Sequence, residues 1–262
     1  MSSTRDINRR PLTARSVIAS TLLGVDPPRL PALALVRSGE LFGLREGATR
    51  TALSRMLANG EVVAEDGHYA LTGPLLVRHA RQQSARNQTR RPWDGTWIAA
   101  VVTGERRSAA DRSAFRTAAT RLKLAEIREG VWMRPGELHA DHDVDARAVM
   151  DDQATWLRDV RPDDPDALIR HFALDDWSER ARATTAEMER WQDALDRRQI
   201  EALGETFVVA ADAVRLLVAD PDLPVEFLRP DWPGSRLRDT FLRFDSAFKD
   251  TWRAWHQSFQ NP

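Results

Sequence analysis

The feature that most constrains this fold is the order of the elements predicted between residues 12 and 72. Three segments carry apolar residues at helical spacing, and two short strand-like segments then flank a tight Asp66-Gly67 turn. The predicted helices cover residues 12–23, 30–42 and 45–58, and the predicted strands cover residues 61–65 and 68–72. Three helices followed by a hairpin within about 60 residues is the order of a winged helix-turn-helix, which is a DNA-binding arrangement.

The third of these helices, over residues 45–58, is predicted to have two different faces. At 3.6 residues per turn, Leu53, Met56 and Leu57 fall on one side, and Thr49 continues that apolar stripe. The opposite face is small, hydroxyl-bearing and cationic, with Arg50, Thr51, Ser54 and Arg55. Such a face can approach a DNA major groove closely, donate to phosphates and reach guanine with a guanidinium group. The alternative is an ordinary solvated surface helix that carries two arginines.

The distribution of charge favours the DNA-binding interpretation of this segment. Residues 1–91 hold 14 arginines against 7 acidic residues, whereas residues 92–262 hold 24 basic against 32 acidic residues. A basic first third joined to an acidic remainder indicates a polyanionic partner for the first third alone. We therefore expect this part of the chain to bind double-stranded DNA. The predicted DNA-contacting residues are Arg45, Thr49, Arg50, Thr51, Ser54 and Arg55.

The composition and motifs of the chain exclude several other classes. The chain has no cysteine, which excludes disulfides and cysteine-based zinc sites and fits a reducing compartment. The apolar run Val17–Val25 is too short to span a membrane, and Asp26-Pro27-Pro28 follows it where a signal peptide would have a cleavage site. We expect a cytoplasmic protein without a membrane partner. No GxSxG, phosphate-loop or dinucleotide motif occurs, so neither an enzyme nor a bound cofactor is expected.

The remainder of the chain predicts two further domains and a helix-rich α+β fold. Strands over 98–102, 131–133 and 154–160, with helices over 109–122 and 166–174, suggest a small ferredoxin-like α+β domain. From residue 176 the chain is predicted to be helical, with helices over 177–202, 205–219 and 235–259. The expected domains are a winged helix-turn-helix over 1–73, a linker helix over 74–92, a ferredoxin-like middle domain over 93–175 and a helical C-terminal effector and dimerisation domain over 176–262.

The helix predicted over residues 235–259 has a wide aromatic face with two possible roles. The face is either part of an internal core or half of a homodimer interface. A two-fold dimer would place two DNA-reading helices about 34 Å apart, which matches a palindromic operator.

Several stretches together resemble the PaaX family of bacterial transcriptional regulators, named for the repressor of phenylacetic acid catabolism. The segments that carry the resemblance are Arg50–Met56 (RTALSRM) after a Gly43-Leu44 turn, Tyr69–Thr72 (YALT), Trp93–Trp97 (WDGTW), Gly130–Pro135 (GVWMRP), and Asp220–Pro224 (DPDLP) with Asp231–Gly234 (DWPG). They occur in the same order as in that family and extend over nearly the whole chain.

The resemblance implies an N-terminal winged helix, a ferredoxin-like middle domain and a C-terminal helical domain that dimerises. It also implies repression by operator binding, released by an aryl-acetyl coenzyme A thioester such as phenylacetyl-CoA. Carried over by position, Arg50, Ser54 and Arg55 would contact DNA. Two features depart from the pattern: Arg45 stands where a helix-capping residue is usual, and the wing turn Ala64–Gly67 is acidic where a basic residue would help to hold a phosphate.

Two further sites are predicted from the sequence. A small acidic effector is expected to bind between the middle and C-terminal domains, where Arg134 and Arg215 offer cations for the phosphates of a thioester. Trp97, near the domain junction, suits either interdomain packing, which is favoured, or stacking on an aromatic ligand. The segment His139–Asp145 (HADHDVD) has histidine and aspartate at spacings that could suit a metal ion. A solvated acidic loop is the favoured interpretation of this segment, and no metal site is predicted.

Three classes of function follow from these observations. The first is an effector-responsive, dimeric transcriptional regulator, expected to be a repressor. The second is a protein-interaction adaptor whose winged helix binds protein, a class kept open by the acidic wing. The third is a metal-dependent nuclease, which depends on the His139–Asp145 segment alone. Steep salt dependence of binding would separate the first class from the second.

Overall fold

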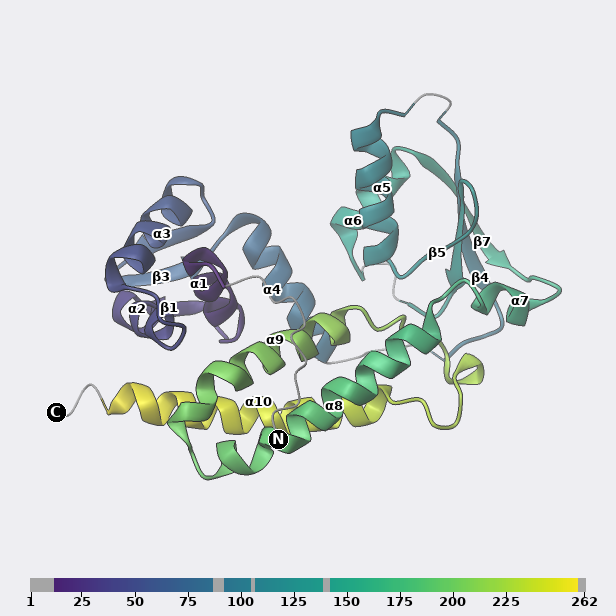
Figure 1. Cartoon of the computed structure of the whole chain (residues 1–262). Coiled ribbons are helices and arrows are strands. Elements are labelled where there is room, and N and C mark those ends of the chain that lie inside the picture. Colours follow the sequence, from purple (N-terminus) through teal and green to yellow (C-terminus); the bar gives the residue numbers. More distant parts are fainter. Residues whose placement is uncertain (1–11, 87–91, 105–106, 139–141, 259–262) are drawn as a thin grey trace. The chain divides into compact units, whose positions relative to one another are not determined.

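The computed structural model describes residues 12–86, 92–104, 107–138 and 142–258. In these ranges the chain is a helix-rich α+β protein with ten α-helices and two small antiparallel sheets (Figure 1). It divides into two compact units, which are described separately. Unit 1 comprises residues 1–87, 183–218 and 236–262, and unit 2 comprises residues 88–182 and 219–235. Within the described ranges, no helix combines the length and the apolar character that a bilayer crossing requires.

The first part of unit 1 contains the helices and the hairpin predicted from the sequence. Its elements are α1 (Ala14–Leu23), β1 (Arg29–Pro31), α2 (Ala32–Glu40), α3 (Glu46–Ala58), β2 (Val62–Glu65), β3 (His68–Leu71) and α4 (Gly73–Arg86). The strands pair antiparallel in the order β1-β3-β2. Asp66 and Gly67 have positive φ angles of 49° and 72°, as a two-residue hairpin turn between β2 and β3 requires. Strand β1 was not predicted, because residue 30 was assigned to the second helix.

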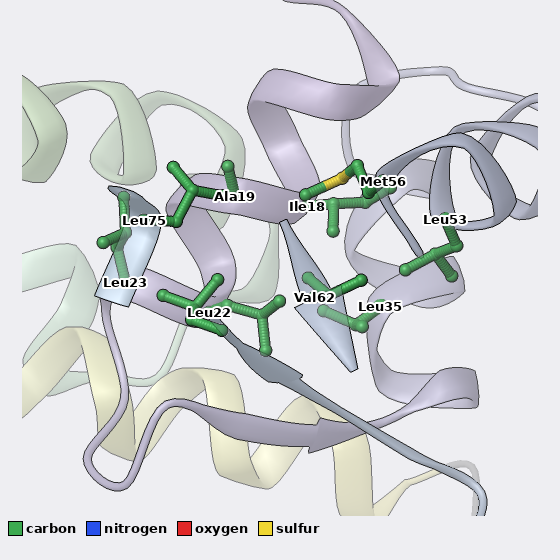
Figure 2. Packing of buried hydrophobic residues seen from close by; sticks show 10 residues of the cluster. Ile18, Ala19, Leu22, Leu23, Leu35, Leu53, Met56, Val62 and Leu75 are labelled. Atoms are coloured by element: carbon green, nitrogen blue, oxygen red, sulfur yellow. The ribbon is translucent and has the colours of Figure 1, made fainter. Parts of the chain in front are cut away.

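One apolar core holds α3 against the neighbouring helices and strands. Leu53 and Met56 of α3 are buried and pack with Ile18 and Leu22 of α1. Figure 2 shows apolar side chains from α1, α2 and α3 converging in this core, to which α4 adds one leucine. Leu57 was predicted to belong to the buried stripe, but its side chain is 43% exposed. The buried stripe of α3 is therefore narrower than its sequence suggested.

A close approach of α2 to α3 fixes the angle at which α3 leaves this core. Thr49 of α3 is fully buried and lies over Gly39 of α2. A Cβ atom on Gly39 would lie 2.5 Å from the Thr49 hydroxyl oxygen, which is too close for any real side chain. Glycine at position 39 is therefore required by packing, because only a residue without a side chain lets the two helices approach this closely.

The second part of unit 1 is helical and lies beside the first. It contains most of α8 (Leu174–Asp196), all of α9 (Leu203–Val218) and nearly all of α10 (Gly234–Gln257). Leu237, Phe241 and Phe244 of α10 are fully buried inside the chain. The aromatic face of this helix, which the sequence assigned to a core or to a dimer interface, is therefore a core element over these positions. Phe207 of α9 meets Phe42 edge to face, with ring centroids 5.0 Å apart.

Unit 2 is built on a four-stranded antiparallel sheet. Its elements are β4 (Trp97–Val102), α5 (Ala109–Arg121), β5 (Ala125–Arg128), β6 (Val131–Pro135), α6 (Val144–Asp151), β7 (Ala154–Val160) and α7 (Pro165–Ile169), and the first turns of α8 follow. The chain order β-α-β-β-α-β and the strand order β5-β6-β4-β7 are those of a ferredoxin-like arrangement. Strand β5 and helix α6 were not predicted. Both are short, and α6 depends on Asp143, whose carboxylate accepts from the Ala146 amide.

The two faces of this sheet are covered by different segments. Helices α5 and α6 cover one face, where Phe115 and Met150 pack with Trp132. The other face carries Trp97 and Met133 and is covered by Phe172 together with residues from the segment 220–234. Alternation along β4 produces this division, because successive residues of a strand point to opposite faces.

The proline-rich segment 220–234, which carries the DPDLP and DWPG sequences, has a packing role in unit 2. The carbonyl oxygen of Asp220 accepts from Lys123 Nζ at 2.8 Å, and the carbonyl oxygen of Asp222 accepts from Arg134 Nη2 at 3.0 Å. The indole ring of Trp232 stacks on that of Trp177, with centroids 4.7 Å apart. These contacts tie the segment to the sheet and to α8.

We expect Gly39→Ala to lower the free energy of unfolding by about 1–3 kcal/mol, because the added methyl group overpacks the contact with Thr49. Urea unfolding followed by circular dichroism measures the change. Gly47→Ala is the matched control, since its Cβ would meet nothing within 4 Å, and alanine in a helix is up to about 1 kcal/mol more favourable than glycine. Equal stabilities of the two variants would contradict the close contact between α2 and α3.

Candidate nucleic-acid interface

The exposed face of α3 is built from small and hydroxyl-bearing side chains. Thr51 and Ser54 are exposed, and each hydroxyl donates to a carbonyl oxygen one turn earlier, at 2.8 Å on Gly47 and 3.1 Å on Arg50. Gly47 and Ala48 are also exposed, near the first turn of the helix. Because no bulky side chain projects along this line, another surface can approach the backbone of α3 closely. Gly47 and Ala48 were not among the residues predicted for this face, although both follow from the same helical spacing.

The two arginines of this face differ in their surroundings. Arg50 Nε lies 2.7 Å from Glu46 Oε1 in an exposed ion pair one turn apart, and both side chains are 57% exposed. Arg55 is exposed and has no ion-pair partner in the part of the chain that the structure describes. An exposed pair such as Arg50–Glu46 contributes about 0–1 kcal/mol, so Arg50 can exchange its partner for another anion at little cost.

Arg45 and Thr49 occupy different positions from the rest of the predicted set. Arg45 is exposed and immediately precedes α3 in extended conformation; within the described residues its side chain makes no capping hydrogen bond. Thr49 is fully buried against Gly39, so its hydroxyl cannot reach a partner outside the domain. Its inclusion among the DNA-contacting residues is corrected here: Thr49 belongs to the same side of the helix as Leu53 and Met56 and supports the packing of α3.

The tip of the β2–β3 hairpin is acidic, as the sequence indicated. Glu65 and Asp66 are both exposed there, beside Gly67. Arg29 Nη2 donates to the backbone carbonyl oxygen of Glu65 at 3.4 Å, and not to the Glu65 carboxylate. Two carboxylates at this tip would repel a phosphate group that approached it.

The geometry of α3 suits insertion into a major groove. The helix stands on a buried apolar stripe, exposes small residues at its first turns and carries two exposed guanidinium groups one to two turns further on. A B-DNA major groove is about 12 Å wide and admits an α-helix. Arginine forms two parallel hydrogen bonds with guanine or phosphate, which is the contact this face can make.

The three predicted effector residues lie in different surroundings. Trp97 on β4 is fully buried and packs near Phe227, with ring centroids 5.8 Å apart. Arg134 on β6 is 1% exposed and forms a buried ion pair with Glu137. Trp97 and Arg134 both belong to unit 2, whereas Arg215 belongs to unit 1, where it lines a cavity beside α4 and α10.

The other cations of that cavity were not predicted from the sequence. Arg78 and Arg86 of α4 and Lys249 of α10 line it together with Arg215. The signal was present in the sequence, because Arg78, Gln82 and Arg86 recur every four residues and therefore share one face of a helix.

The aspartates and histidines of the segment His139–Asp145 do not form one cluster in the described residues. His139 and Asp141 lie outside those residues. Asp143 caps α6 and forms an ion pair with Arg121, at 2.8 and 2.5 Å from Nε and Nη2. Burial, followed by the positive charge of Lys123, lowers the pKa of His142. Among the residues described, no group of three or more histidine, aspartate or glutamate side chains is placed to hold a metal ion.

Comparisons with known proteins agree with this architecture. The family model described as PaaX-like protein matches residues 13–75, and that of the PaaX-like protein C-terminal domain matches residues 172–258. No curated protein matches the chain. Among solved structures, the chain is similar to the uncharacterised protein Rv0674 from Mycobacterium tuberculosis, with 35% identity and a TM-score of 0.70 over 92% of this chain and 98% of that one. The resemblance drawn from the sequence motifs is thereby confirmed: the chain belongs to the PaaX-like family.

Proposed function

We propose that this protein is a DNA-binding transcriptional regulator whose helix α3 reads an operator. The observation that carries the proposal is the exposed face of α3, where Arg50, Thr51, Ser54 and Arg55 project from a helix anchored by its opposite side. Membership of the PaaX-like family supports a role in transcription regulation in general. An enzymatic role is not part of the proposal.

The electrostatics of α3 favour a phosphate or a base edge over free solvent as the partner of its arginines. Arg50 is held near the start of the helix by Glu46, and breaking this exposed pair costs at most about 1 kcal/mol. A guanidinium group that pairs with guanine contributes about 1–3 kcal/mol of discrimination against other bases. The loss of the Glu46 pair therefore costs Arg50 little when it turns to DNA, although nearby phosphates would then repel Glu46.

The proposed regulator acts as a repressor on a palindromic operator and is released by a small acidic effector, such as an aryl-acyl coenzyme A thioester. A homodimer would present two copies of α3 to half-sites about 34 Å apart, one helical turn of DNA. The effector releases DNA only if it binds more tightly to the dimer geometry that misfits the operator. These finer features are supported by the resemblance to the PaaX family.

A protein-interaction adaptor is the competing function, and the acidic wing is the observation that favours it. Glu65 and Asp66 would weaken contacts to phosphate at the position where a winged helix often touches the DNA backbone. The adaptor would bind its partner through the same face of α3 with a shallow dependence on salt, because fewer counterions are released.

We expect Arg50→Ala/Arg55→Ala to weaken binding to DNA from the upstream region of this protein's own gene at least tenfold, because two cationic contacts to phosphates or bases are lost. Fluorescence anisotropy at 50 and 200 mM salt measures the affinity, and the slope of log affinity against log salt is expected to be shallower in the variant. Parallel titrations include phenylacetyl-CoA, which is expected to release the wild-type protein.

Arg128→Ala/Arg243→Ala is the matched control, because both residues are exposed and the same two positive charges are removed from elements other than α3. An equal loss of DNA affinity in both variants would show that binding depends on the net charge of the protein and not on the arginines of α3. Absence of binding at either salt concentration would overturn the DNA-binding function and favour the adaptor.

We expect Glu65→Gln/Asp66→Asn to tighten DNA binding severalfold at 50 mM salt, because two carboxylates no longer repel the phosphate backbone. Asparagine tolerates the positive φ of position 66, so the turn is retained. The same anisotropy assay measures the change. An unchanged affinity would show that the wing stays away from DNA in the complex.

A further inference from the structure

A cavity of ≈ 90 Å³ lies inside unit 1, between the last turn of α1 and the helices α4, α9 and α10. Phe207 of α9 and Phe248 and Trp252 of α10 give it an aromatic lining, to which Leu23 and Val214 add aliphatic surface. A water molecule needs about 10–15 Å³ by a comparable measure, so the cavity has room for several groups of that size. This is the space that an aromatic group of one or two rings requires.

The lining carries an excess of positive charge. Four basic side chains reach the cavity: Arg78, Arg86, Arg215 and Lys249. Among the described residues that line it, Asp245 alone carries a carboxylate. An apolar pocket with a few converging polar groups is the usual form of a small-molecule site, and the sign of these groups selects an anion.

Asp245 is shared between two of these cations. Its Oδ2 lies 2.7 Å from Lys249 Nζ and 3.4 Å from Arg86 Nη1. The Arg86 side chain is only 10% exposed and lies over the Phe241 ring. Its Nε is buried and has no hydrogen-bond partner in the described part of the chain. A buried cationic donor without an acceptor is costly, and an incoming carboxylate would supply the acceptor.

The other two cations, Arg78 and Arg215, come from α4 and α9. Arg215 pairs with Asp212, which does not line the cavity, in an exposed pair that contributes little. Partial removal from water, and then the positive charges of Arg215 and Arg15, lower the pKa of Arg78. These guanidinium groups therefore repel one another, and a bound anion would relieve that repulsion.

We propose that this cavity binds an aromatic group joined to an anionic group, and that it is the effector site of the regulator. The aromatic group would lie against Phe248 and Trp252, and the anion would meet the guanidinium groups of Arg78, Arg86 and Arg215. The regulatory half of this proposal rests on the DNA-binding function proposed above; the binding half does not.

The walls of the cavity belong to elements that also hold α3 in place. Leu23 lines the cavity and is part of the core that contains Leu53 and Met56. Helix α4 contributes Leu75 to the same core, and its His79 Nε2 lies 2.9 Å from the carbonyl oxygen of Val25 at the end of α1. A ligand that separates α1 or α4 from α9 and α10 would therefore change the packing that holds α3 in place. Such a ligand would bind the two arrangements of these helices with different affinities, which is what release of DNA requires.

Isothermal titration calorimetry of the whole protein without DNA tests the binding half, with 2-naphthoate as the probe and neutral 2-naphthamide as its isostere. We expect one site per chain for 2-naphthoate, and binding of the amide at least tenfold weaker. A parallel titration with 2-naphthoyl-coenzyme A shows whether the anion comes from a free acid or from the phosphates of a thioester. Binding of either supports the site, and binding of neither overturns it.

Arg78→Gln/Arg215→Gln is expected to weaken binding of the anionic probe at least tenfold, and Arg243→Gln, an exposed control on α10 outside the cavity, to leave it within twofold. Ala211→Leu, which narrows the cavity without changing its charge, should also weaken binding. Circular dichroism verifies that each variant is folded. Equal affinities in Arg78→Gln/Arg215→Gln and in Arg243→Gln would overturn the location.

Addition of the bound probe to the protein–DNA complex tests the regulatory half. We expect a severalfold loss of DNA affinity in wild type and none in Arg78→Gln/Arg215→Gln. Calorimetric binding with unchanged DNA affinity would overturn the effector role and leave the ligand site intact. Absence of DNA binding with calorimetric binding retained would instead be a failure of the proposed function.

Discussion

The structure of unit 1 depends on the packing of one side of α3 against α1 and α2. Leu53 and Met56 enter the core, and Thr49 lies so close to Gly39 that an added Cβ atom at position 39 would force a shift. Leu57 stays partly exposed, and the face of α3 that carries Arg50, Thr51, Ser54 and Arg55 is small, polar and cationic. The exposed arginines are thus presented by a rigid support, which is what a helix that reads a groove requires.

The same helices connect this support to the rest of unit 1. Helix α1 contributes to the core beneath α3 at Ile18 and Leu22, and ends at a cavity with an aromatic and cationic lining. Helix α4 leaves the same core at Leu75 and reaches that cavity with Arg86. A ligand in the cavity therefore contacts the elements that determine the position of α3. In this account, recognition of DNA and recognition of a ligand are properties of one packed unit.

The periodic segments of the sequence were sufficient to predict α1, α3 and the hairpin, and Asp66-Gly67 predicted the position of its tight turn. Strand β1 and strand β5 were missed because three or four residues carry no detectable period, and their pairing is determined by partners distant in sequence. Thr49 shows why a site residue can be predicted wrongly. Its helical spacing placed it with Leu53 on the buried side, whereas its hydroxyl group suggested a contact with DNA, and the residue is fully buried. Trp97 and Arg134 were predicted as effector contacts from their residue type. Residue type cannot distinguish a side chain that contacts a ligand from one that is buried against other residues of the protein.

Site-directed photo-crosslinking tests the central claim most directly, because the chain has no cysteine and one introduced thiol is the sole attachment point for an azidophenacyl group. Ala48→Cys places the group on the exposed face of α3, and Ser246→Cys places it on an exposed position of α10. The account predicts crosslinks to operator DNA from position 48 and not from position 246. Crosslinks from position 246 alone, in protein that still binds the operator, would contradict the assignment of α3 as the helix that reads DNA.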